Sequence, residues 1–233
     1  MRCSHGFAVA LAATLIVPAI GAAQDASKPV AGGGISAPGW MGKIDAREAS
    51  SGAKLEDSKL VTMGEGLHVT TGPAVVYWNP ANTASGNYTV EATFTEREFM
   101  GLNDHAHPYG IVIAGNNMGT DEQSYLYCAA YGNGNFIVRG FGPAAFAMNG
   151  GRQGQASEAV NKASAKGQSV TQKIALKVSA DKVECIINDK VAGTYAKSDL
   201  VAAGKLKSTD GIYGIRFGHN TDAHVAGLKM TKN

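Results

Sequence analysis

The sequence predicts an all-β protein in which two antiparallel sheets pack face to face. Three observations support this fold class: apolar and polar residues alternate along several segments, Gly and Asn mark the turns between them, and no crossover helix separates them. The clearest example is residues 172–195, which read as two alternating strands joined by a two-residue turn at Ala180-Asp181. One face of each strand therefore meets a core, and the other meets water.

The first 39 residues lie outside the predicted sandwich. Arg2 precedes an apolar stretch over residues 7–20, and the small residues after it suit a signal peptidase, so we expect a cleavable signal peptide over residues 1–23. The signal peptide predicts a periplasmic or secreted protein. The apolar stretch is short for a membrane span, so we expect no stable membrane insertion after cleavage. A retained membrane anchor is the alternative. Residues 24–39, rich in Gly, Ser, Ala and Pro, predict a flexible leader before a single domain over residues 40–233.

The charge balance excludes one class of partner. Removing the signal peptide takes away one basic and no acidic residue, which leaves 20 Lys and Arg against 19 Asp and Glu and a net charge of +1. Binding to nucleic acid needs a concentrated basic patch, and no such run occurs in the chain. We therefore expect no nucleic-acid partner.

The remaining elements follow one another as short strands. A Gly132-Asn133-Gly134 turn predicts a hairpin, because Gly and Asn supply the positive φ values that tight hairpins require. A weakly helical stretch ends at Gly167 within an otherwise long loop, and residues 198–205 predict a short turn or helix. The expected strands, besides the pair in residues 172–195, are two within 66–77, then 88–94, 109–114, 125–131, 135–140, 212–217 and 223–230, and the expected short helix is 156–165.

Two cysteines follow the predicted cleavage point, Cys128 and Cys185. By alternation, Cys128 shares a face with Leu126, and Cys185 shares a face with Val183 and Ile187, so both sulfur atoms point into the core. An oxidising compartment would allow the two cysteines to form a disulfide. A disulfide requires close Cα atoms, which the sequence does not show, so we favour two buried, unpaired thiols.

Several segments together resemble a known group of folds. They are GWMGKID near the start, YTVEATF, YGIVIAG, SYLYCAAYGNGNFIVRG, the hairpin KVSADKVECIINDKVAG and the closing DGIYGIRFGHNTDAHVAGLKM. This order resembles the concanavalin A-like, laminin G-like jelly rolls, and among them the 3-keto-disaccharide hydrolase-type domains of exported bacterial proteins, over residues 40–230. The resemblance implies a jelly-roll sandwich with a carbohydrate or glycan across its concave sheet.

The resemblance leaves the kind of function open. Laminarinase-type relatives carry a Glu-x-Asp-x-x-Glu strand that places two carboxylates on one face, and this chain has only Glu96 and Glu98 two apart, with Gly101 where the third acid would fall. We therefore favour a carbohydrate-binding module over its alternatives. These are a glycoside or keto-sugar hydrolase or lyase, with Glu91 or His105 as acid or base, and a structural or protein-interaction sandwich.

Alternation also predicts which residues would line a sugar cleft. Sugars stack their apolar ring faces on aromatic side chains, while carboxylate and guanidinium groups fix their hydroxyls. Ordinary cross-strand pairs and an exposed ion pair would produce the same pattern without a ligand. The predicted outward row is Glu91, Tyr125, Tyr127, Tyr131, Arg139 and Arg216.

Two polar segments could hold a metal ion. Asp104 with His105-x-His107 offers imidazole and carboxylate donors suited to zinc, although no further partner is evident in the sequence. Asn220 and Asp222, in a cluster with His219 and His224, offer oxygen atoms that suit calcium. The alternative for both is a solvated loop whose Asn and Asp side chains serve the turn. No other cofactor is expected.

Overall fold

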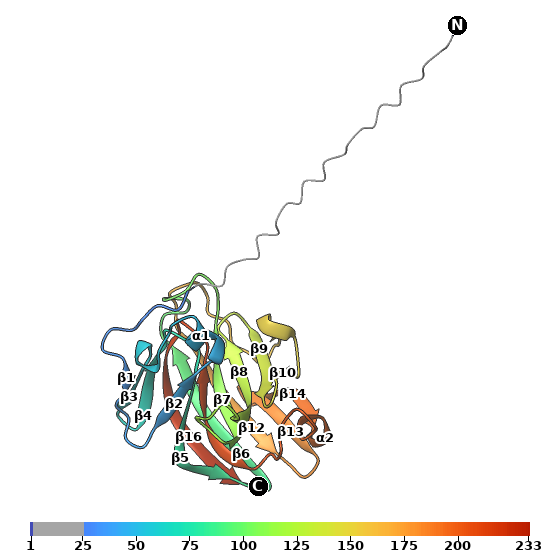
Figure 1. Ribbon diagram of the computed structural model, residues 1–233. Coiled ribbons are helices and arrows are strands. Elements are labelled where there is room, and N and C mark those ends of the chain that lie inside the picture. The colour runs from blue at the N-terminus through green and yellow to red at the C-terminus, as the bar shows by residue number, and fades with distance from the viewer. Residues whose placement is uncertain (2–25) are drawn as a thin grey trace.

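The computed structural model describes Met1 and residues 26–233, so the predicted signal peptide lies outside the described residues. These residues form the expected sandwich of two sheets (Figure 1). The first sheet has the order β1-β3-β4-β16-β6-β12-β13-β14, and the second has the order β10-β9-β8-β7-β15-β5-β2, with β11 paired to β9. All strand pairs are antiparallel except β1 with β3.

The strands of the first sheet are β1 (Gly34–Ile35), β3 (Lys59–Met63), β4 (Gly66–Thr70), β6 (Tyr88–Glu96), β12 (Val170–Val178), β13 (Lys182–Ile187), β14 (Lys190–Ala196) and β16 (Asp222–Lys232). Those of the second sheet are β2 (Met41–Ile44), β5 (Val75–Ala84), β7 (Pro108–Asn116), β8 (Ser124–Tyr131), β9 (Asn135–Phe141), β10 (Phe146–Ala147), β11 (Gln155–Ala156) and β15 (Gly211–Phe217). The helices are α1 (Ala46–Ser50), η1 (Leu55–Asp57), η2 (Gly151–Gln153) and α2 (Lys197–Leu200). In the described part of the chain, no helix is long and apolar enough to cross a membrane.

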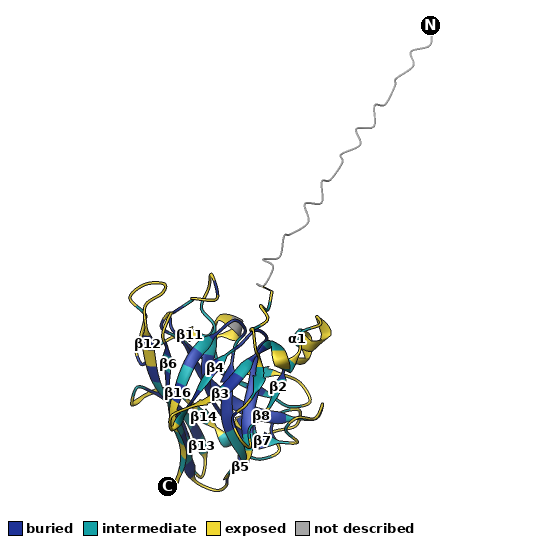
Figure 2. Ribbon diagram, turned by 90° about the vertical axis from the view of Figure 1, so that its left-hand side faces the viewer, coloured by how far each residue is buried: buried dark blue, intermediate teal, exposed yellow. Residues whose placement is uncertain are grey.

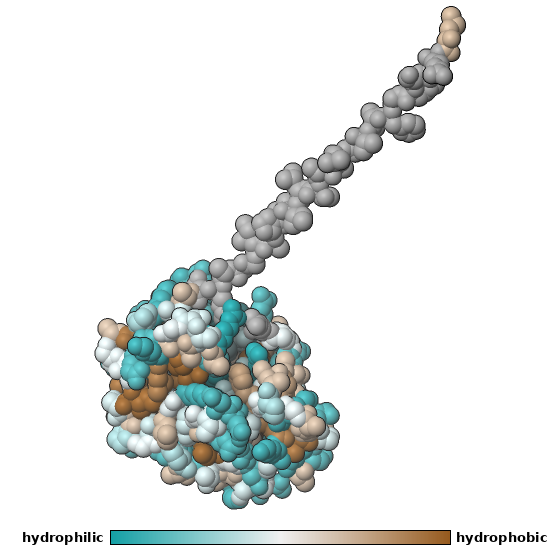
Figure 3. Space-filling view, viewed as in Figure 1, coloured by the Kyte–Doolittle hydropathy of each residue, from teal (hydrophilic) through white to brown (hydrophobic). Residues whose placement is uncertain are grey.

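The inward faces agree with the predicted alternation. Along β6, Tyr88, Val90, Ala92 and Phe94 are buried, and the threonines and Glu91 between them are half-buried. Figure 2 shows the same contrast between buried strands and an exposed α1. On the surface seen in Figure 3, patches of apolar residues alternate with strongly polar ones.

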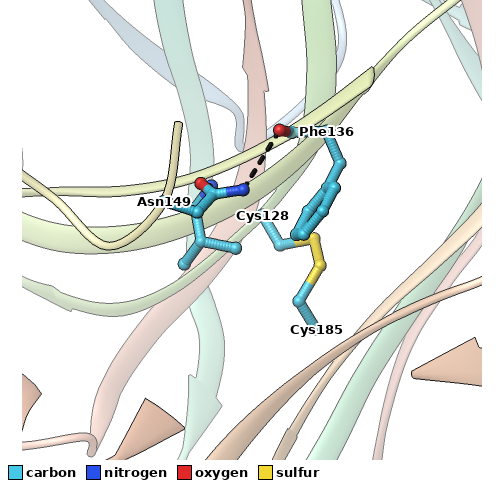
Figure 4. The surroundings of a disulfide bond; sticks show 5 residues. Cys128, Phe136, Asn149 and Cys185 are labelled. Carbon is cyan, nitrogen blue, oxygen red and sulfur yellow. Dashed lines mark hydrogen bonds between the residues drawn. A yellow bond between two sulfur atoms is a disulfide. The ribbon is translucent and has the colours of Figure 1, made fainter. Parts of the chain in front are cut away.

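A disulfide bond links the two sheets through the core. Cys128 on β8 and Cys185 on β13 form a disulfide, with their Cα atoms 6.0 Å apart (Figure 4). Both cysteines are fully buried, as predicted. The expectation of two unpaired thiols is wrong, because the two strands face each other across the sandwich and bring the inward side chains together.

Two local predictions are also wrong. The stretch 156–165 forms no helix; instead, Gln155 and Ala156 pair with β9 in β11, and Lys162 bridges to Asn133. The second strand of residues 172–195 ends at Ile187, because Asn188 and Asp189 both adopt positive φ, of 49° and 63°, and form a second hairpin turn. Asn and Asp tolerate this left-handed backbone better than most residues.

The N-terminal segment contacts the sandwich before β2 begins. The amide of Val30 donates to the carbonyl oxygen of Asp57, and β1 pairs in parallel with β3. Asn220 also contacts this segment: its side-chain oxygen accepts a hydrogen bond from the Lys28 amide at 2.7 Å. Residues 26–35, which we expected to belong to a leader, therefore contact η1, β3 and the turn before β16.

Candidate functional site

The predicted sugar-binding row is divided between the two sheets. Tyr127 on β8 pairs with Arg139 on β9, and both belong to the second sheet. Glu91 lies on β6 of the first sheet, where its carboxylate is 3.1 Å from the Lys229 ammonium and 3.7 Å from that of Lys173. The outward faces of two packed sheets point away from each other. The prediction that Glu91 shares one cleft with the tyrosines and arginines is therefore wrong.

The tyrosines are buried, although they point away from the main core. The exposed fractions are 0% for Tyr125, 4% for Tyr127 and 5% for Tyr131. They pack into a second apolar group, which we call the outer aromatic cluster: Val76, Trp78, Val112, Tyr125, Tyr127, Ala129, Tyr131 and Ile137, with Ala106, Met118, Phe141 and Ile212 around it. These three rings expose almost no surface on which a sugar could stack, and a ligand-binding role for the tyrosines stays a prediction.

Arg216 lies within the outer aromatic cluster and is already paired. Its guanidinium donates to the Tyr125 hydroxyl at 3.0 Å and to the Asp45 carboxylate at 2.6 Å. The same group lies 5.1 Å from the ring centre of Tyr127 and 5.0 Å from that of Phe141, within cation–π distance. A buried charge is stabilised by such a partner set. We conclude that Arg216 anchors α1, through Asp45 at its start, to the second sheet.

A polar groove lies on the first sheet instead. It has a volume of about 640 Å³ and opens at the end of the sheet where β4, β6 and β16 meet the loop between β6 and β7. We call it the polar groove. Its lining residues are His68, Thr70, Glu96, Arg97, Glu98, Gly101, Leu102, Gly167, Asn220, Asp222 and His224.

The floor of the polar groove is organised around Asp222. One oxygen of this carboxylate accepts hydrogen bonds from His68 Nε2 at 2.9 Å and from the Thr70 hydroxyl at 2.5 Å. The His68 and His224 rings meet edge to face, with their centres 4.7 Å apart. Partial burial, His68 and Arg97 lower the pKa of His224, which favours its neutral form. The groove therefore offers donors and acceptors on a partly preorganised surface.

Glu96 forms part of the wall of the polar groove. Burial raises the pKa of its carboxyl group to about 7, and the nearby charge of Asp222 adds to this effect. One carboxyl oxygen accepts a hydrogen bond from the Met100 amide at 3.0 Å, where the Met100 backbone has a left-handed φ of 59°. Glu96 thus holds the start of the loop between β6 and β7 and is close to half-ionised at neutral pH.

Three histidines come together beside the polar groove. His105 and His107 lie on the loop before β7, and His219 lies in the turn between β15 and β16; one nitrogen from each is within 4.8 Å of the others. We call them the histidine cluster. Burial and the neighbouring His219 and His105 lower the pKa of His107 to about 3, so that ring is neutral at physiological pH.

The predicted zinc donors are thus brought together only in part. His105 and His107 are adjacent as expected, but the third imidazole comes from His219, more than a hundred residues away in the chain. The Asp104 carboxylate lies 2.7 Å from His105 Nδ1, so it contacts one of the three histidines directly. Sequence spacing showed the two nearby histidines, and only the fold could supply the third.

The predicted calcium donors, Asn220 and Asp222, both have hydrogen-bond partners within the protein. Asn220 is 2% exposed, and its side chain bonds to the backbone of Ala26 and Lys28 and to the side chain of Asn103. Asp222 is the first residue of β16 and points into the polar groove. The Asn220 side chain is therefore engaged by the N-terminal segment and by Asn103, and calcium binding by this pair stays a prediction.

Comparisons with known proteins support the fold. No protein-family model and no curated protein matches the chain. The carbohydrate-binding module CBM66 from Bacillus subtilis matches with a TM-score of 0.55 at 8% identity, over 86% of this chain and 99% of the module. A protein of unknown function with a galectin-like fold, also from Bacillus subtilis, matches with a TM-score of 0.55 at 11% identity, over 83% of this chain and 89% of that protein. The chain thus has the galectin-like, concanavalin A-like jelly-roll fold.

Proposed function

We propose that this protein is an exported carbohydrate-binding protein and that its ligand occupies the polar groove. The observation that carries the proposal is the groove's composition: three carboxyl groups, two histidines, a hydroxyl and an arginine line a space of about 640 Å³. A sugar presents many hydroxyl groups, each able to donate and accept hydrogen bonds, and such a lining can satisfy them.

Two further points support carbohydrate as the ligand class. The similarity to the carbohydrate-binding module CBM66 extends over nearly the whole length of that module. The predicted signal peptide would place the protein in the periplasm or outside the cell, where polysaccharides are accessible. The disulfide is consistent with folding in an oxidising compartment.

Asp222 is the residue on which binding should depend most. Its carboxylate already orients His68 and Thr70, so its removal would both delete an acceptor and free the neighbouring donors. A hydrogen bond to a charged group contributes roughly 1.5–3 kcal/mol, which corresponds to about 10- to 100-fold in affinity. We expect Asp222→Ala to weaken glycan binding by at least about tenfold.

A glycan array with the purified protein would first identify a ligand, and calorimetric titration would then compare variants. Arg139→Ala, on the opposite sheet beside the outer aromatic cluster, is the matched control and should bind normally. Absence of binding to every plant, bacterial and storage polysaccharide would overturn the proposal. Equal affinity of Asp222→Ala and the native protein would overturn the choice of groove.

A glycoside or keto-sugar hydrolase is the second candidate function. Glu96 favours it, because a carboxyl group in a groove wall with a pKa of about 7 suits a general acid at neutral pH. A hydrolase would lose turnover in Glu96→Gln while keeping substrate affinity. A binding protein would show no sugar release with either form.

A further inference from the structure

We propose that the histidine cluster is a metal site, binding one divalent transition-metal ion, with zinc as the first choice, through His105, His107 and His219. Nothing in the proposed sugar-binding function requires this site, and the inference does not depend on that function. It rests on the convergence of three imidazoles from two separate loops.

The nitrogen positions are close to those of a metal site. Tetrahedral zinc with Zn–N bonds of about 2.0–2.1 Å places its ligand nitrogens about 3.3 Å apart. His107 Nε2 and His219 Nε2 are 3.0 Å apart, and all three candidate nitrogens lie within 4.8 Å of one another. The His105 and His107 ring centres are 4.4 Å apart. A small rotation of the exposed His105 ring would complete the arrangement.

Two of the three histidine rings each contact a carboxylate through Nδ1. Asp104 lies 2.7 Å from His105 Nδ1, and Glu48 on α1 lies 3.4 Å from His219 Nδ1. Metal-binding histidines commonly give their second N–H to a carboxylate, which fixes the tautomer and turns the other nitrogen toward the metal. Glu48 is itself held by a 2.5 Å hydrogen bond from the Ser27 hydroxyl. The cluster therefore has supporting groups as well as donors.

The backbone around the cluster is also fixed. The amide of Gly218 donates to the Pro108 carbonyl oxygen at 2.7 Å, which joins the two histidine-bearing segments. A side chain at Gly218 would meet the Pro108 ring at 2.9 Å and His107 Cβ at 3.0 Å. The Asn103 side chain donates to the His219 carbonyl oxygen at 3.2 Å. Glycine at position 218 thus permits the close approach that brings His219 to His107.

The donor set indicates which ion would bind. Three imidazoles suit zinc, copper or nickel, whereas calcium and magnesium prefer oxygen donors. The His105 side chain is 51% exposed and that of His219 is 2% exposed, so solvent reaches the site from one side. Three histidines with one open side leave a fourth position for water or a ligand, the arrangement found at catalytic rather than structural zinc sites.

The test is metal binding by the purified full-length mature protein after removal of bound metal with a chelator. Titration with Zn²⁺ by calorimetry should show one ion per chain, and Co²⁺ should give the intense visible absorption of a four-coordinate site. His105→Ala, an exposed position that should not disturb folding, and His107→Ala should each weaken zinc binding by more than about 100-fold. Glu48→Gln should weaken it by about 10- to 100-fold.

His224→Ala is the matched control, since it removes a histidine of the polar groove and should leave zinc affinity unchanged. No uptake at one ion per chain, or equal affinity in the native protein and His105→Ala, would overturn the proposal. Loss of binding in His224→Ala as large as in His105→Ala would also overturn it, because it would place the ion elsewhere. Glycan binding is measured separately, so failure of either proposal leaves the other standing.

Discussion

The disulfide between the two sheets should make a large contribution to stability. Cys128 and Cys185 are separated by 57 residues, and closing a loop of this size removes chain entropy from the unfolded state. The loop-entropy relation gives about 4 kcal/mol at 25 °C. Both residues are fully buried and small, so replacing both with Ala should add only a minor packing cost. We expect Cys128→Ala/Cys185→Ala to unfold with a free energy about 4 kcal/mol lower than that of the native protein.

Urea denaturation under oxidising conditions, followed by tryptophan fluorescence, measures this difference. For a domain of this size, about 4 kcal/mol corresponds to a fall in melting temperature of roughly 8–16 °C. The native protein in excess reductant should move close to the double variant, which is the internal control. Equal free energies of unfolding for the native and variant proteins in oxidising buffer would show that the two thiols are unpaired in solution.

Two further predictions concern buried charges. Asp45→Asn removes the carboxylate that pairs with Arg216 and should lower the free energy of unfolding, measured in urea, by about 2 kcal/mol. This is less than the roughly 3–5 kcal/mol expected for a fully buried pair, because water reaches Asp45. An unchanged urea midpoint would show that the pair does not anchor α1. Burial raises the pKa of the Glu96 carboxyl group from 4.5 to about 7 in the folded protein. Between these pH values the carboxyl group is ionised in the unfolded chain but still largely protonated in the folded protein. The free energy of unfolding should therefore fall by about 3 kcal/mol as the pH rises from 4.5 to 7. The free energy of unfolding of Glu96→Gln should lack this pH dependence, and that of the exposed control Glu98→Gln should keep it. Identical pH profiles of stability for the two variants would show that Glu96 is not the group with the raised pKa.

Much of the fold could be predicted because its strands alternate clearly. In β6 and β12, an apolar residue at every second position gave the inward face, and the structure buries Val90, Phe94, Ile174 and Leu176. The Gly132-Asn133-Gly134 hairpin was also predictable, since its residues suit positive φ. The cysteine pairing was not, because alternation gives the direction of a side chain and not the strand that faces it.

The prediction that the sugar-binding row shares one cleft was wrong for a related reason. Period-two alternation correctly put Tyr125, Tyr127 and Arg216 on the face opposite Leu126, but it cannot say which sheet a strand joins. It therefore could not separate Glu91 from the tyrosines. One signal was present: the neighbouring segments VVYW and GIVIA are apolar at successive positions, which is typical of strands buried on both faces. Such segments indicate that the outward face of the second sheet is covered.

The third histidine of the cluster could not be foreseen from spacing. His105 and His107 are two apart, whereas His219 approaches them because β7 pairs with β15 and brings their ends together. The sequence carried all three residues, and only the register between these strands made them neighbours. Sites that depend on long-range pairing are therefore the least accessible to sequence reasoning.

The position of a bound glycan on the protein decides whether the polar groove is the binding site. An NMR titration of the ¹⁵N-labelled protein with the glycan selected on the array would report which backbone amides change. We predict that the largest shifts fall on residues 68–70, 97–102 and 222–224 around the polar groove. Shifts centred instead on Tyr127 and Arg139 of the second sheet would place the ligand over the outer aromatic cluster and exclude the polar groove.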